Sequence, residues 1–157
     1  MSTHLETERT EAPAEVAELS YREAIGAALE HALEEDPSVL LMGEDVATAG
    51  GVFKTNEGLP EKFGLERIRN TPICENGFLG VALGMAVTGM RPVVEIMFSD
   101  FLPTAADAIV NELPKYRFMS GGQCVTPVRC GRSAARPGAS GRSTPRPASR
   151  GTWACPG

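Results

Sequence analysis

Two acidic positions in this sequence could do chemistry, and the first is Glu75. It follows the run Thr71-Pro72-Ile73-Cys74 and stands at the expected start of a helix. A carboxylate in the first turn interacts favourably with the positive end of the helix dipole, so position alone favours a structural role. The same carboxyl could hold or move a proton if a pocket shielded it from water. The residues alone leave both interpretations open.

The second acidic position is the pair Glu44-Asp45, which follows the apolar run 39–42. Open α/β folds bind ligands at the carboxyl ends of their strands, so this pair could line a site. Spacing alone favours the simpler interpretation of an exposed loop pair. The segment from Met97 to Phe101 ends a later apolar run, and its aromatic residues are more typical of a core than of a cofactor contact.

Other kinds of catalytic site find little support. His4 and His31 both lie in or before the first predicted helix, so no Ser/His/Asp or Cys/His set is available. The four cysteines form no CxxC pair, and a zinc site needs a tighter cluster of thiolates and imidazoles. We expect no metal ligands in this chain.

The elements that must position these residues alternate between helices and short strands. Ser20 and Glu23 form a capping-box pattern, and apolar residues at helical spacing follow. We expect helices at about 21–35, 75–87 and 103–118, strands at 39–42, 67–70, 91–97 and 125–128, and one helical turn near 60–63 in the long loop 43–64. This alternation predicts an α/β domain with a mostly parallel sheet flanked by helices.

Three glycines lie on one face of the helix predicted at 75–87. They are Gly77, Gly80 and Gly84, and each costs roughly 1 kcal/mol relative to Ala in a helix interior. Close approach of another backbone would compensate for this cost. The approaching segment could be the domain's own sheet or a helix of a partner chain.

Charge divides the chain of 157 residues into unequal parts. The first 128 residues hold nine Lys and Arg against all 20 Asp and Glu, whereas 129–157 holds six Arg, no acid and one large apolar residue, Trp153. We expect an acidic, disordered leader at 1–19, a partial domain at 20–128 and a disordered tail at 129–157. Because 125–128 starts a strand that the tail does not continue, we suggest that the tail is read out of frame.

Composition also excludes several classes of protein. No apolar run approaches the roughly 20 residues that span a bilayer, and the acidic N-terminus is unlike a signal peptide. The acidic body argues against nucleic-acid binding. We therefore expect a cytoplasmic protein that binds neither membrane nor nucleic acid.

Several stretches together resemble one family. They are Gly43-Glu44-Asp45-Val46, Gly51-Val52-Phe53-Lys54, Asn70-Thr71-Pro72-Ile73-Cys74-Glu75-Asn76-Gly77-Phe78, Val87-Thr88-Gly89-Met90-Arg91-Pro92, Glu95-Ile96-Met97-Phe98-Ser99-Asp100-Phe101 and Lys115-Tyr116-Arg117-Phe118-Met119-Ser120-Gly121-Gly122. In this order they resemble the β subunit of the E1 component of thiamine-diphosphate-dependent 2-oxo acid dehydrogenases. The resemblance covers about 21–128 and implies a truncated, transketolase-like pyrimidine-binding domain.

The resemblance implies a role for each of five residues. Glu75 matches the glutamate that hydrogen-bonds N1′ of the aminopyrimidine of thiamine diphosphate. Met97 and Phe101 match residues that pack on this ring, Ile73 matches one that flanks it, and Glu44 matches an acidic neighbour. Burial of Glu75 must then outweigh the pull of the helix dipole.

The resemblance also implies partners. An E1 α subunit, in an α2β2 heterotetramer, would hold the diphosphate and Mg2+, and a lipoyl group on E2 would accept the acyl group. The substrate stays open between pyruvate, branched-chain and acetoin types.

Alternatives are a non-catalytic fragment or binding module, or a domain of a transketolase, against which the segment 95–101 argues. Pro114 departs from the usual Ala and puts the end of its helix in doubt.

Overall fold

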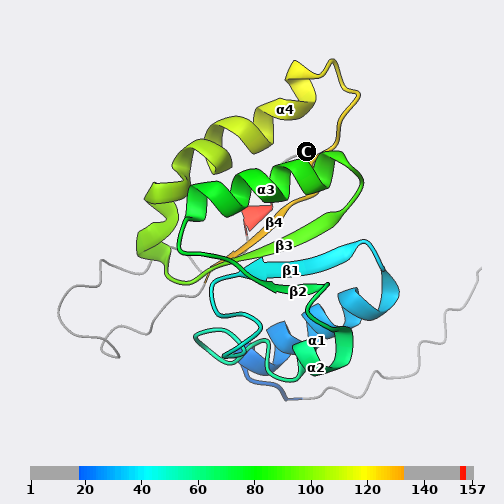
Figure 1. Cartoon of the computed structure of the whole chain (residues 1–157), viewed down its shortest axis with the longest axis vertical. Coiled ribbons are helices and arrows are strands. Elements are labelled where there is room, and N and C mark those ends of the chain that lie inside the picture. The colour runs from blue at the N-terminus through cyan, green and yellow to red at the C-terminus, as the bar shows by residue number, and fades with distance from the viewer. Residues whose placement is uncertain (1–17, 133–152, 155–157) are drawn as a thin grey trace, which may run out of the picture.

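The computed structural model describes residues 18–132 and Trp153–Ala154, and it shows a sheet with helices on both faces (Figure 1). The helices are α1 (Tyr21–Glu35), α2 (Leu59–Phe63), α3 (Glu75–Val87) and α4 (Leu113–Met119), with a 3-10 segment η1 (Ser99–Ala105) and a π segment η2 (Ala108–Glu112). The strands are β1 (Val39–Gly43), β2 (Ile68–Asn70), β3 (Arg91–Ile96), β4 (Arg129–Arg132) and β5 (Trp153–Ala154). Most of the predicted leader, residues 1–17, lies outside the described residues.

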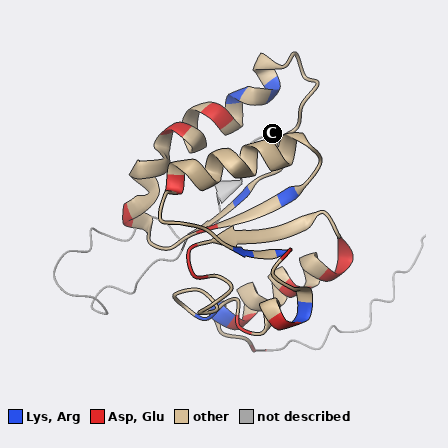
Figure 2. Cartoon of the chain, in the orientation of Figure 1, with Lys and Arg blue, Asp and Glu red and all other residues tan. Residues whose placement is uncertain are grey.

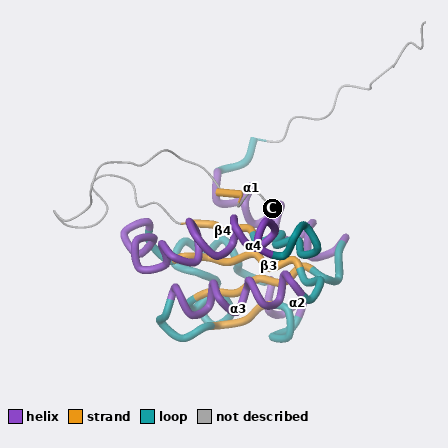
Figure 3. The backbone as a smooth tube through the Cα atoms, turned by 90° about the horizontal axis from the view of Figure 1, so that it is seen from above, coloured by secondary structure: helices purple, strands orange, loops and turns teal. Residues whose placement is uncertain are grey.

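The sheet confirms the predicted fold class. Its order is β2-β1-β3-β4-β5, and among the described residues the first four strands run parallel. Alternate residues of each strand serve two cores, as side chains on a pleated strand must. Leu40 and Val94 face α3 and the segment 99–119, whereas Leu41 and Ile68 face α1 and α2. Figure 3 shows these layers from above.

Helix α1 begins and ends where the local signals predict. Ser20 Oγ accepts a hydrogen bond from the backbone N–H of Glu23 at 3.3 Å, and the Glu23 carboxylate accepts one from the backbone N–H of Ser20 at 2.8 Å. This reciprocal capping box satisfies two N–H groups that the first turn leaves free. No helix of the described part is long and apolar enough to cross a membrane.

The helix predicted at 103–118 is wrong in its start and in its form. The helical segment begins four residues earlier, at Ser99, and Pro103 lies inside its 3-10 part. The π segment follows, and the Leu113 N–H bonds to Ala108 O, five residues back. Because Pro114 has no N–H to offer, the regular α-helical ladder cannot run through this point. The helix whose end Pro114 was expected to disturb therefore contains a π turn directly before α4.

The fourth strand lies at Arg129–Arg132, whereas the prediction placed its start at 125–128. The apolar content of 125–128 predicted a strand there, but Val125 is exposed and Pro127 has no N–H to donate to a neighbouring strand. Pairing with β3 decides the strand instead: Val94 pairs with Cys130, which is buried. These four residues belong to the tail expected to be disordered, and β5 pairs antiparallel with β4. The rest of the tail lies outside the described residues.

The glycine face of α3 is open in the described part of the chain. A Cβ placed on Gly80 or on Gly84 would have no neighbouring atom within 4 Å, whereas one on Gly77 would lie 2.8 Å from Cys74 Sγ. The interpretation that the domain's own sheet approaches these glycines is therefore wrong at Gly80 and Gly84. Apart from Glu75, α3 carries no charged side chain (Figure 2).

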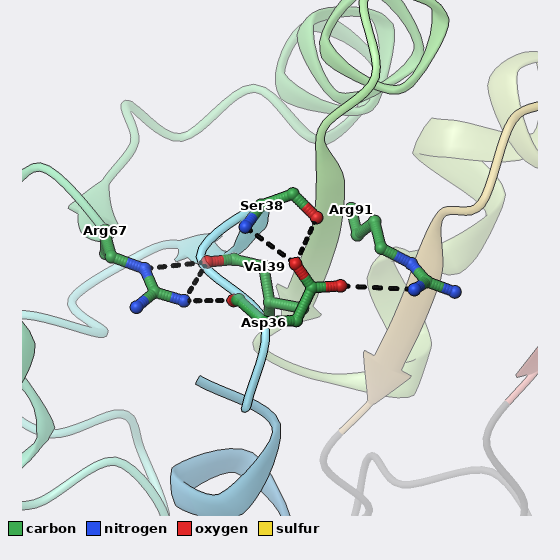
Figure 4. A network of polar contacts seen from close by, with 5 residues as sticks. All are labelled: Asp36, Ser38, Val39, Arg67 and Arg91. Carbon is green, nitrogen blue, oxygen red and sulfur yellow. Dashed lines mark hydrogen bonds and ion pairs between the residues drawn. The ribbon is translucent and has the colours of Figure 1, made fainter. Parts of the chain in front are cut away.

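An arginine joins α1 to the amino ends of the central strands. The guanidinium of Arg67 donates to the backbone carbonyls of Leu33, Asp36 and Val39 at 2.7–2.9 Å. Figure 4 shows the bonds to Asp36 and Val39. The Asp36 carboxylate accepts bonds from Ser38 and pairs with Arg91 at 3.1 Å. Arg67 thus connects backbone carbonyls at the carboxyl end of α1 with the first residue of β1.

We predict that Arg67→Ala lowers the free energy of unfolding by roughly 2–4 kcal/mol, because four hydrogen bonds to partly buried backbone carbonyls are lost. Urea denaturation measures this change. The matched control is Arg69→Ala in β2, since within the described part of the chain Arg69 bonds only to Glu66, whose side chain is exposed. The control should change stability by less than about 0.5 kcal/mol. Equal effects of the two substitutions would contradict the role given to Arg67.

The loop 44–58 is fixed to the sheet through Glu95. Asn56, which is fully buried, donates to Glu95 Oε2 at 2.6 Å. Glu95 Oε1 is buried and has no hydrogen-bond partner within residues 18–132. Gly51 lets the loop come this close, because its Cβ would lie 2.7 Å from the Asn56 amide nitrogen and 3.0 Å from Glu95 Oε1. Burial raises the pKa of Glu95, and the bond from Asn56 only partly opposes this.

We predict that Glu95→Gln removes the loss of folding stability that ionisation of the buried Glu95 carboxyl causes as pH rises. Because the pKa of Glu95 is higher in the folded chain, its protonated form favours folding. The stability it contributes is present below the unfolded pKa, about 4.5, and is lost as pH rises through the folded pKa. Measured by urea denaturation from about pH 4 to pH 8, the variant should gain stability relative to the parent as pH rises. Glu66→Gln, at an exposed side chain, should show no such trend.

Candidate functional site

The carboxyl ends of three parallel strands meet at one edge of the sheet. Gly43, the last residue of β1, pairs with Asn70 of β2 and with Glu95 of β3. Glu44 therefore follows directly on this edge, and the segment from β2 to Glu75 starts there too. Met97 follows β3 at the same edge. The sequence prediction that these residues gather at one edge depends on this register.

Gly43 lets β1 end tightly against β3. A Cβ at this position would lie 2.6 Å from the backbone oxygen of Glu95, a distance that no ordinary side chain tolerates. The chain then turns sharply, because Asp45 adopts a left-handed conformation with φ of 55°. Glu44, between them, is only 5% exposed. The interpretation of Glu44-Asp45 as an exposed loop pair is thus wrong for Glu44, whereas Asp45 is exposed.

The carboxyl group of Glu44 has little access to water. Its Oε1 atom is buried and has no hydrogen-bond partner among the described residues. Burial, and then the charges of Glu75 and Asp45, raise the pKa of Glu44. Both causes favour the neutral acid over the carboxylate. Glu44 is therefore suited to keep a proton beside a second carboxyl group.

Glu75 is the first residue of α3, as predicted, and is 8% exposed. The Cys74 side chain makes no capping bond, so the helix start has no side-chain acceptor there. A carboxylate at this place benefits from the helix dipole. The structural interpretation and the chemical one therefore both fit its position. What distinguishes Glu75 from an ordinary first-turn acid is its burial next to Glu44.

The three apolar residues proposed for the site lie around the same edge. Met97 follows β3 and is half-buried, Phe101 in η1 is 39% exposed, and Ile73 is 85% exposed. The Phe101 ring meets Phe98 edge to face, with centroids 5.9 Å apart. Since η1 packs against α3, Phe101 lies on the same face of the sheet as Glu75. Phe101 and Ile73 are exposed apolar side chains in the segments that follow β3 and β2.

Two polar residues near the site escaped the sequence analysis. The Oγ atom of Thr71 is buried and makes no hydrogen bond to any residue that the structure describes, although Thr71 N–H donates to Gly43 O at 2.9 Å. Asn70 accepts from Ala47 N–H at 2.7 Å. Both stood inside the stretch 70–78 that carries the resemblance, but nothing in their spacing marked them. No cluster of three or more metal-binding side chains occurs in the described part of the chain.

Comparisons with known proteins show the family to which the chain is similar. A family model described as "Transketolase, pyrimidine binding domain" matches residues 17–136. The chain is 46% identical over 111 residues to the pyruvate dehydrogenase E1 component subunit beta-2, mitochondrial, of Oryza sativa subsp. japonica, a match that covers 71% of this chain and 30% of the relative. It is 44% identical over 113 residues to the pyruvate dehydrogenase E1 component subunit beta of Staphylococcus epidermidis, covering 72% and 35%.

The chain thus spans about a third of the length of these curated relatives. A solved structure titled "Split gene transketolase, inactive beta4 tetramer" matches 59% of this chain and 29% of its own, with 29% identity and a TM-score of 0.48. The family match covers more than half of the chain and includes every element from α1 to β4. The chain belongs to the transketolase pyrimidine-binding domain family.

Proposed function

We propose that this chain supplies the pyrimidine side of the active site in the β subunit of a thiamine-diphosphate-dependent 2-oxo acid dehydrogenase E1 component. The observation that carries the proposal is the burial of Glu75 beside Glu44 at the carboxyl edge of the sheet. The similarity to pyruvate dehydrogenase E1 β subunits supports it. The finer substrate assignment, between pyruvate, branched-chain and acetoin types, stays open.

The residues at this edge fit an aminopyrimidine ring. Such a ring is flat and apolar on its faces and carries hydrogen-bonding nitrogens on its rim. Ile73 and Phe101 offer exposed apolar side chains for the faces, and Met97 lies at the same edge. The unpartnered Glu44 Oε1 and Thr71 Oγ are buried polar atoms that a ligand could satisfy. We therefore assign the ring to this side of the sheet.

In this proposal Glu75 hydrogen-bonds N1′ of the ring and exchanges a proton with it. When bound, thiamine diphosphate supplies a nucleophilic carbon and an electron sink for the loss of carbon dioxide. Glu44, which stays neutral more readily than an ordinary glutamate, keeps the local charge low and can hold a further proton. Met97, Phe101 and Ile73 orient the ring and exclude water from the carboxyls.

The diphosphate and Mg2+ are assigned to an E1 α subunit, because this chain offers carboxyls and apolar surface at the site. The open glycine face of α3, with Val81 51% exposed beside it, supports a contact with such a partner. In the intact complex a lipoyl group on E2 would accept the acyl group. An α2β2 assembly and a cytoplasmic location complete the proposal. A non-catalytic binding module remains the alternative that the next experiment tests.

We predict that Glu75→Gln lowers 2-oxo acid decarboxylation by roughly 100-fold or more in the complex with an E1 α subunit, because Gln cannot exchange a proton with N1′. The assay follows 2-oxo acid decarboxylation with an artificial electron acceptor. Glu57→Gln, at an exposed loop position, is the matched control and should leave the rate unchanged. Unchanged turnover in Glu75→Gln would reduce Glu75 to a helix-dipole partner. The full chain without a partner should show no turnover.

We predict that Gly80→Ala combined with Gly84→Ala stabilises the isolated chain by about 1–2 kcal/mol, since Ala favours the helix and both methyl groups enter open space. Urea denaturation measures this gain. The same double variant should weaken association with the α subunit, measured by titration calorimetry. Gly77→Ala should gain less, because its Cβ meets Cys74 Sγ. Association as tight as that of the parent would exclude this face as the contact.

A further inference from the structure

The segments that carry Glu44 and Glu75 are bonded to each other next to the two carboxyls. Gly43 and Asn70 are the last paired residues of β1 and β2, and Thr71 N–H donates to Gly43 O at 2.9 Å. Beyond this point the two chains diverge. One turns into the loop that starts with Glu44, and the other leads through four residues to Glu75.

The side chain of Asn70 continues the connection past the end of the strands. Its Oδ1 accepts from the backbone N–H of Ala47 at 2.7 Å, and its Nδ2 donates to Thr48 Oγ1 at 3.1 Å. The Thr48 hydroxyl in turn lies 3.4 Å from Asp45 Oδ1. A chain of polar contacts therefore leads from the residue that ends β2 to the residue next to Glu44.

The turn after Glu44 needs such support. Asp45 is a non-glycine residue in the left-handed region, with φ of 55°, a conformation that persists only when surrounding contacts hold it. Ala49 N–H and Gly51 N–H bond to Asp45 O and close the turn on itself. The bonds from Asn70 fix this closed turn relative to β2.

We propose that Asn70 is a positioning residue: it ties the turn after Glu44 to the segment that leads into Glu75 and so sets how closely the two carboxyls lie. Asn70 touches neither carboxyl and acts through the backbone of 45–48. Its importance for catalysis rests on the proposed function, whereas its effect on the two carboxyls does not.

The exposed position of Asn70 makes the proposal testable. Because its side chain lies outside both cores, Asn70→Ala should leave the chain folded. Asn70→Asp keeps the acceptor for Ala47 N–H, and the Thr48 hydroxyl can rotate to donate to the new carboxylate. Asn111 offers a matched control, since it is also exposed and also accepts one side-chain bond, from Lys115, and donates one, to Asp107.

The experiment is a 13C NMR titration of the Glu44 side-chain carboxyl in the full chain without cofactor or partner. The charged groups that raise its pKa are Glu75 and Asp45, and burial adds to them. In Asn70→Ala the turn should move away from β2 and admit water, so the pKa of Glu44 should fall toward that of an ordinary glutamate. Asn70→Asp should keep it raised, and Asn111→Ala should leave it unchanged.

An unchanged Glu44 titration in a folded Asn70→Ala chain would overturn the proposal. The complex with an α subunit gives a second measurement: Asn70→Ala should lower kcat more than it raises KM, and Asn70→Asp should restore most of the loss. If Asn70→Ala shifts the titration but Glu75→Gln leaves turnover unchanged, the proposed function fails and the positioning role stands. If Asn70→Ala leaves the Glu44 titration unchanged but Glu75→Gln abolishes turnover, the positioning role is rejected and the proposed function stands.

Discussion

The close parallel pairing of β1 with β3 is the constraint on which the site depends. Gly43 has no Cβ to collide with the Glu95 carbonyl, so the two strands end in register and Glu44 enters the interior directly behind them. A glutamate that loses water gives up hydration free energy unless it stays neutral or finds partners. Two such groups, Glu44 and Glu75, share this edge. The strand pairing thus keeps two carboxyl groups buried at a place where burial without a bound partner costs free energy.

The parts of the fold with strong local signals were predictable. Helix α1 follows its capping box, and α3 begins at Glu75 and ends just before Gly89, which adopts a left-handed conformation. Strand β4 was not predictable from its own residues, since Arg129–Arg132 carry little apolar content and pair because β3 offers its edge. Pro114 indicated only a disturbance of its helix, and the π segment itself was not predictable, because its hydrogen-bond pattern depends on the turn before Pro114.

For the site, the sequence supplied the residues but not their environments. Spacing favoured an exposed Glu44, because burial of a loop carboxyl depends on the fold of 44–58 over the sheet. In the sequence, Glu95 lies within an apolar run typical of a strand. Its hydrogen bond to Asn56 joins residues that are 39 positions apart. The contact between Asn70 and Ala47 likewise spans 23 positions. Only the folded register brings such pairs together.

The π turn before α4 has an effect on everything that follows it. One extra residue in a turn rotates the later side chains by roughly 100° relative to an uninterrupted α-helix. The outward direction of Phe118, which is 88% exposed, is therefore fixed by the number of residues in 108–112 and not only by their identity. A one-residue deletion there that restored regular winding would leave the later side chains facing as they do now, because the lost residue and the lost wide turn offset each other.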